Sequence, residues 1–138
     1  MTITSFLKYY FPALAWGVII FILLSLPEDN LPDLSFWQKI PYFDKLVHFG
    51  LFAIFSFLLC LAFKNQLCFN LLIKHWKVSS FLISTLYGGI TEVSQKLFFT
   101  RSAELGDFLA DICGSVLGVI IFNFIVKKYC RNGYKKIS

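Results

Sequence analysis

Four long apolar runs restrict the fold of this chain more than any other feature. Each run, over residues 9–26, 46–63, 78–99 and 108–126, is long enough for a helix to cross a hydrocarbon core of about 30 Å. Hydrophobic residues make up 57% of the chain and charged residues 15%, against about 25% charged residues in a typical soluble domain. The sequence therefore predicts an all-α membrane protein with four transmembrane helices at approximately these positions.

The connections between the apolar runs contain no Gly/Ser-rich or charged linker, so we predict one domain over residues 1–138. Short connections place consecutive helices side by side, which predicts an antiparallel bundle. Residues 27–41 contain three prolines and are predicted to be a surface loop, and residues 64–77 a short basic segment on the bilayer. A cleaved signal peptide is the alternative for the first run, but no small-x-small motif follows it, so we expect a retained helix.

The charged residues predict an orientation. Most of the 13 lysines and arginines lie beside the N-terminus, in the second loop or in the tail: Lys8, Lys64, Lys74, Lys77, Lys127, Lys128, Arg131, Lys135 and Lys136. By the positive-inside rule, both termini are cytoplasmic. The eight acids lie in or near the first and third loops: Glu28, Asp29, Asp33, Asp44, Glu92, Glu104, Asp107 and Asp111. The outer face is therefore predicted to be acidic.

The net charge of +5 does not indicate nucleic-acid binding, because the basic residues flank apolar runs. Anionic headgroups of the lipid bilayer are the partner that this arrangement favours. The four cysteines show no CxxC pair and no metal-ligand spacing: Cys60, Cys68, Cys113 and Cys130. We expect free thiols, since three of the four fall on the reducing cytoplasmic side.

Polar residues gather near the predicted outer ends of the second, third and fourth helices. They are Asp44, Lys45, His48, Glu92, Gln95, Arg101, Asp107 and Asp111. An ionised group inside a span costs about 2.5–3.5 kcal/mol at the bilayer centre and less near its edge, so we expect these groups to face inward and pair. We interpret the set as a ligand-binding or functional polar cluster. Lys45 and Gln95, taken alone, suit interhelical hydrogen bonding better.

On the fourth predicted helix, the acids continue into a stripe of glycines. Asp107, Asp111, Gly114 and Gly118 step by four, three and four residues and so share one face. The sequence from Gly114 to Gly118 reads GSVLG, and a GxxxG spacing lets another helix approach closely. We predict that these two glycines are helix-packing residues.

This pattern resembles the VanZ-like family of small bacterial membrane proteins. The matching stretches are DKLVHFGLF at 44–52 and ITEVSQKLFFTRSAELGDFLADICGSVLG at 90–118, with the signature D-K-x-x-H, E-x-x-Q, R and D-x-x-x-N/D-x-x-G-x-x-x-G. Two departures are Asp111, where asparagine is common, and Phe99-Thr100, where a proline-containing turn is common before Arg101. The resemblance covers all four predicted spans and implies a multi-pass protein of the bacterial inner membrane.

The resemblance implies a contribution to tolerance of teicoplanin-type glycopeptides. The first hypothesis is an outward-facing pocket that binds an envelope component, such as a lipid-linked precursor or a lipoglycopeptide. The alternatives are a membrane-embedded enzyme acting on a lipid-linked or headgroup substrate, and a helix-packing subunit of a larger complex. For the enzyme, His48 would act as a base, or Asp44, Glu92, Asp107 and Asp111 would hold a divalent cation. The lack of a GxSxG or HExxH motif counts against the enzyme, so we favour a non-enzymatic role and assign no catalytic residue. We expect no cofactor, and a divalent cation at these residues has no support from the sequence.

Overall fold

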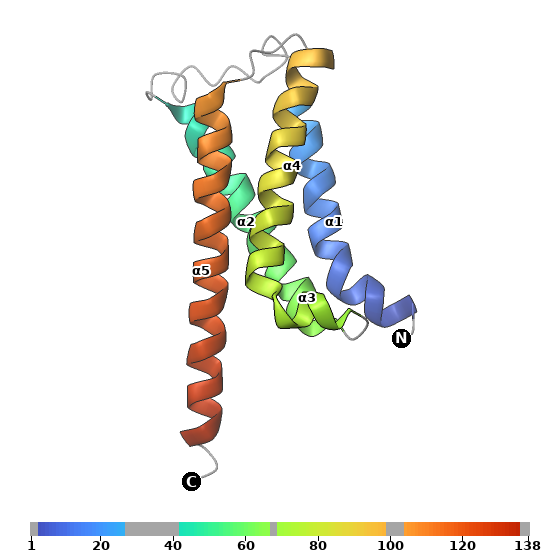
Figure 1. Ribbon diagram of the computed structural model, residues 1–138, viewed down its shortest axis with the longest axis vertical. Coiled ribbons are helices and arrows are strands. Elements are labelled where there is room, and N and C mark those ends of the chain that lie inside the picture. The colour runs from blue at the N-terminus through green and yellow to red at the C-terminus, as the bar shows by residue number, and fades with distance from the viewer. Residues whose placement is uncertain (1–2, 27–41, 67–68, 99–103, 136–138) are drawn as a thin grey trace.

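The structure is a computed structural model that describes residues 3–26, 42–66, 69–98 and 104–135. Within these ranges it contains helices and no strand: α1 (Ile3–Ser25), α2 (Phe43–Asn65), α3 (Asn70–Lys74), α4 (Trp76–Phe98) and α5 (Leu105–Lys135). The four long helices alternate in direction, and α1 begins at the end of the bundle where α5 finishes (Figure 1). The prediction of an all-α protein is confirmed.

Among the described residues, three helices are long and apolar enough to cross a membrane, over Leu7–Ser25, Phe43–Asn65 and Leu105–Lys128. They coincide with the first, second and fourth predicted spans. The third predicted span falls on α4, which has the same 23-residue length as α1 and α2. Helix α4 is less apolar than these because polar side chains follow one of its faces.

The polar face of α4 points into the bundle and its apolar face points out. Its buried residues are Ser80, Ser84, Gly88, Thr91, Glu92 and Gln95. Its exposed large hydrophobic side chains recur every three or four residues along the opposite face and include Val78, Leu82, Leu86, Ile90, Val93 and Leu97. A helix at a water-exposed surface has the opposite distribution, with its apolar stripe toward the core. The pattern of α4 is therefore that of a helix whose outer face meets lipid or another protein.

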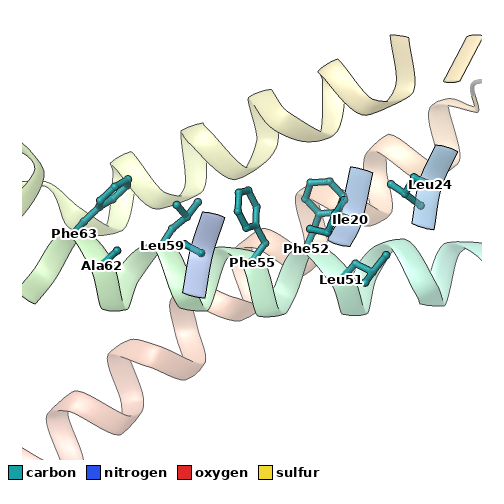
Figure 2. Packing of buried hydrophobic residues seen from close by; sticks show 9 residues of the cluster. Ile20, Leu24, Leu51, Phe52, Phe55, Leu59, Ala62 and Phe63 are labelled. Atoms are coloured by element: carbon teal, nitrogen blue, oxygen red, sulfur yellow. The ribbon is translucent and has the colours of Figure 1, made fainter. Parts of the chain in front are cut away.

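An apolar core lies between α1 and α2. Figure 2 shows it as a row of side chains along α2 facing two from α1, and its members are Ala13, Ile20, Leu24, Leu51, Phe52, Phe55, Leu59, Ala62 and Phe63. Hydrogen bonds also fasten α1 to its neighbours, and two of them lie near its middle. Trp16 Nε1 donates to the Leu51 carbonyl of α2 at 3.0 Å, and the Tyr87 hydroxyl of α4 donates to the Gly17 carbonyl at 2.7 Å. Helix α2 thus lies at the centre, in contact with α1, α4 and α5.

The most extensive helix pair, α2 with α5, depends on two glycines. A Cβ atom added to Gly114 would overlap the carbonyl oxygen of Phe49, and one added to Gly118 would overlap that of Ala53. The two backbones are therefore in direct contact. Small polar side chains continue the contact, since Ser56 Oγ donates to the Ser115 carbonyl at 2.8 Å.

The connection between α2 and α4 is partly helical. The predicted basic segment at 64–77 includes the short helix α3. Helix α5 continues well beyond the apolar run, to Lys135. Cys60 and Cys113 are free thiols, buried and exposed respectively, whereas the side chains of Cys68 and Cys130 lie outside the part that the structure describes.

Candidate functional site

Most of the predicted polar cluster meets at one end of the bundle. This is the end where α2 and α5 begin and where α4 finishes, at the top of Figure 1. Helix α2 supplies three residues of its first turns, α4 supplies one and α5 supplies two, and together they are Asp44, Lys45, His48, Glu92, Asp107 and Asp111. We call this set the acidic pocket, a name for the cluster of side chains and not for a cavity. Its residues come from three helices, so only the folded bundle creates it.

The floor of the acidic pocket is a buried triad of His48, Glu92 and Asp111. The Nδ1 atom of His48 lies 3.0 Å from Oδ1 of Asp111 and 3.8 Å from Oε1 of Glu92. The side chains of His48, Glu92 and Asp111 are 1%, 9% and 0% exposed. One imidazole nitrogen therefore faces two carboxylates that are shielded from solvent.

Several oxygens of the buried triad have no hydrogen-bond partner in the described part of the chain. These are both carboxylate oxygens of Glu92 and the Oδ2 oxygen of Asp111. Among the described residues, no lysine or arginine forms an ion pair with either acid. Burying an ionised carboxylate without such compensation costs several kcal/mol. The triad is thus a place of unbalanced negative charge unless a proton or cation joins it.

The rim of the acidic pocket is organised by Lys45. Its Nζ atom lies 2.8 Å from Oε2 of Glu104 and 3.2 Å from Oδ1 of Asp107. Asp107 is buried, whereas about half of the Glu104 side chain is exposed. Lys45 therefore links the start of α2 to the start of α5. Residue spacing pointed to Lys45 and Asp107 but not to Glu104 as a partner.

Two further glycines leave space for side chains of the acidic pocket, and the sequence analysis did not predict their role. A Cβ atom at Gly88 would lie 2.8 Å from Oδ2 of Asp111, and one at Gly106 would lie 2.6 Å from Cε of Lys45. Gly88 lets Asp111 of α5 reach α4, close to Glu92. The available signal for Gly88 was its i,i+4 spacing to Glu92, which places both on one face of α4.

The remaining residues predicted from the sequence make no contact within the acidic pocket or lie outside the described residues. Gln95 is buried, and its Nε2 donates to the Leu24 carbonyl at 3.0 Å, so it joins α4 to the end of α1. Gly114 and Gly118 follow Asp111 along α5 and contact the α2 backbone. Arg101 lies in 99–103, outside the described residues.

The donor atoms of the acidic pocket suit a cation or a mobile proton. Two groups of three residues bring one ligand atom each to within 4.8 Å of one another: His48 with Glu92 and Asp111, and Asp44 with His48 and Asp107. Imidazole nitrogen and carboxylate oxygen are ligands for divalent metals. The same groups accept protons, so acid–base chemistry is also within their range.

An apolar groove of about 550 Å³ lies between α4 and α5 beside the acidic pocket. Its lining residues are Thr85, Leu86, Gly89, Ile90, Val93, Ser94 and Phe108. Phe108 follows Asp107 in the chain, and Val93 follows Glu92. The groove and the acidic pocket therefore lie at the same level of the bundle, on different faces of α4 and α5.

Comparison with known proteins reveals a family match. Residues 4–126 match the family model described as VanZ/LLP1, which covers α2, α3 and α4 completely, nearly all of α1, and α5 as far as Val126. No curated protein and no solved structure matches the chain.

Proposed function

Since the chain belongs to the VanZ/LLP1 family, we propose that it is a multi-pass inner-membrane protein that binds an envelope component and contributes to tolerance of teicoplanin-type glycopeptides. The observation that carries this proposal is the acidic pocket. Charged and polar groups inside a membrane bundle are costly and mark binding or transport sites. Here they meet at one end of the bundle and are not scattered over its length.

We place α4 in the membrane as the fourth span. Its exposed face is a stripe of large hydrophobic side chains, and its polar residues from Ser80 to Gln95 turn inward. Lipid solvates such a stripe, whereas water would not. With four spans, the basic residues gather on the side of both termini, and the positive-inside rule places that side in the cytoplasm. The acidic pocket then opens to the outer surface.

The ligand that this arrangement favours is a lipid or lipid-linked molecule. Its apolar chain would occupy the groove between α4 and α5, whose volume is within the range of about 300–1,000 Å³ usual for ligand pockets. Its headgroup would reach the acidic pocket, where the carboxylates attract a cationic group or a cation bound to phosphate. A lipopeptide antibiotic and a lipid-linked wall precursor both combine these two parts.

The second candidate is an enzyme acting on the headgroup of such a lipid. The observation that favours it is the contact between His48 and Asp111, which could orient the imidazole as a general base. If the protein is an enzyme, replacing His48 should abolish turnover of the lipid and leave the amount of bound lipid unchanged. If the protein only binds the lipid, the wild type should show no turnover either.

Orientation and the fourth span are tested together by labelling of single-cysteine variants. A membrane-impermeant maleimide applied to intact cells is expected to label Tyr42→Cys and Phe98→Cys, at the pocket end. It is expected to label the native Cys130 and Lys77→Cys only after the cells are broken. The reason is that α4 joins Lys77 to Phe98 across the bilayer. Labelling of Lys77→Cys and Phe98→Cys from the same side would reject α4 as a span.

Lipid binding is tested by native mass spectrometry of the protein in mild detergent. We expect a bound lipid that is retained by Leu82→Trp and lost from Gly89→Trp. The added ring at Gly89 points into the groove beside Phe108, whereas Leu82 is exposed on α4 but does not line the groove. Equal lipid occupancy in the two variants would contradict the groove assignment. A protein subunit bound in place of lipid would favour the role of packing partner in a larger complex.

A further inference from the structure

We infer that the buried triad of His48, Glu92 and Asp111 is a binding site for one divalent transition-metal cation, of the Zn²⁺ or Mn²⁺ type. The inference deepens the proposed function, because the triad is the floor of the same acidic pocket. Metal binding is nevertheless measured without any lipid. The metal inference and the proposed function can therefore be rejected independently of each other.

Charge balance is the first reason for a metal. Glu92 and Asp111 together bring two negative charges to a place where Glu92 is nine-tenths buried and Asp111 is fully buried. Within the described residues, His48 is the only basic side chain that pairs with them. A cation of charge +2 beside a neutral imidazole would neutralise both carboxylates at once. Buried charges in proteins are paired or coordinate metals.

The unsatisfied oxygens are the second reason. Both oxygens of Glu92 and Oδ2 of Asp111 are buried and without a well-formed hydrogen bond in the described part of the chain, and the Glu104 backbone is the group that approaches the Glu92 carboxylate. Oε1 of Glu92 is aimed at the imidazole, but at 3.8 Å it is too distant for a hydrogen bond. Unsatisfied buried groups of this kind call for an explanation such as an ion. A metal between the three side chains would satisfy them.

The geometry of the triad is the third reason. Ligand atoms about 2.0–2.1 Å from a tetrahedral metal are separated from one another by about 3.3 Å. The separations from His48 Nδ1 are 3.0 Å to Asp111 and 3.8 Å to Glu92, and all three ligand atoms lie within 4.8 Å of one another. The site would therefore close around a metal with small shifts of its side chains. Three protein ligands leave a coordination position open, as in catalytic and substrate-binding metal sites.

The ligand types select the metal. Mg²⁺ and Ca²⁺ are hard cations that prefer all-oxygen sites, and Mg²⁺ keeps several of its waters. The imidazole nitrogen suits Zn²⁺ and the two carboxylates also suit Mn²⁺, so the mixed set favours these two ions. Gly88 contributes by leaving space for Asp111 against α4. A metal with an open position would also let this acidic pocket hold a phosphate group.

The other possible trio, Asp44 with His48 and Asp107, is less suitable. Asp44 is exposed, so its carboxylate is already solvated. Asp107 is paired with Lys45, whose ammonium lies 3.2 Å from it and would repel a cation. The buried triad has neither disadvantage.

The test uses full-length protein in mild detergent, purified without a histidine tag, stripped with chelator and then loaded with Zn²⁺, Mn²⁺, Mg²⁺ or Ca²⁺. Metal content by elemental mass spectrometry should reach one Zn²⁺ or Mn²⁺ per chain, with weaker binding of Mg²⁺ and Ca²⁺. Glu92→Gln, Asp111→Asn and His48→Gln should each lower the affinity by about a hundredfold or more, since loss of even an outer-shell group costs about 10–100-fold. Co²⁺ should give a visible absorption band in the wild type and not in these three variants.

The control is His75→Gln, which removes an imidazole far from the triad, near the opposite end of α4, and should retain the metal. Metal should raise the melting temperature of wild type and leave that of Glu92→Gln unchanged. A cooperative melting transition of Glu92→Gln without metal, at or above that of metal-free wild type, excludes misfolding as the cause. Metal content in wild type no higher than in Glu92→Gln would overturn the inference, as when protons balance the charge. Loss of metal in Asp44→Asn but not in Glu92→Gln would also overturn it. Lipid occupancy, measured separately, decides the proposed function.

Discussion

Replacing Gly114 with alanine should separate α2 from α5 and lower the free energy of unfolding by about 2–3 kcal/mol, within the range of overpacked cores. The new methyl group would meet the carbonyl oxygen of Phe49, with the amide nitrogen of Ala53 only 3.1 Å away. Both obstacles are backbone atoms of a regular helix, so neither can rotate aside. The measurement is thermal unfolding in detergent, and its readout is the fraction of protein that stays monodisperse as the temperature rises.

The matched control is Gly50→Ala, because Gly50 lies in α2 and a Cβ atom added there would have no other atom within 4 Å. Alanine is a better helix former than glycine by about 1 kcal/mol, so this change should be neutral or stabilising. The same substitution should therefore have opposite signs at the two positions. If both variants unfold at the same temperature, the close contact of α5 with α2 is not what holds this pair together.

The second large effect is expected at the acidic pocket. Glu92→Gln and Asp107→Asn should each reduce growth in a sub-lethal lipoglycopeptide series to that of cells lacking the protein. The amides keep the shape of the side chains and still hydrogen-bond, but they remove a charge. An amide that merely joins helices is tolerated, whereas a carboxylate that binds a cation or a ligand cannot be replaced in this way.

Stability separates this outcome from simple misfolding. Glu92 has no described cationic partner other than His48, so Glu92→Gln should be at least as stable as metal-free wild type because it removes a buried charge. Protein level is followed by blot, and His75→Gln, near the opposite end of α4, serves as the control for growth. Full protection by both amide variants at normal abundance would mean that the acidic pocket is structural.

The sequence predicted the helices well because membrane helices are defined by length and hydrophobicity. Their ends were less accurate. Helix α2 begins at Phe43, before the apolar run at 46–63, and α5 continues to Lys135. In both cases charged residues extend the helix beyond the apolar run, because they are compatible with helical backbone and can remain solvated at the surface. The length of an apolar run does not reveal where such a helix ends.

The acidic pocket was predictable as a set of residues but not as a set of contacts. Spacing of i,i+3 and i,i+4 shows which residues share a face of one helix. It does not show which helix lies opposite, so the pairing of Lys45 with Glu104 and of His48 with Asp111 required the fold. The same limit applies to Gly88, whose role depends on Asp111 of another helix. Spacing alone also offered no reason to prefer a histidine and two carboxylates over four carboxylates as metal ligands.

With α4 as the proposed fourth span, its inverted polarity has a consequence for how the protein is made. A segment that carries Ser84, Glu92 and Gln95 on one face is a poor substrate for insertion into lipid by itself. Insertion of α4 becomes favourable once α1 and α2 are present to cover that face, because Gln95 bonds to α1 and Glu92 faces α2. Biogenesis would then be sequential, with the first two helices acting as a template for α4. A defect in α2 would consequently appear as wrong topology of α4 and α5, before any question of folded stability arises.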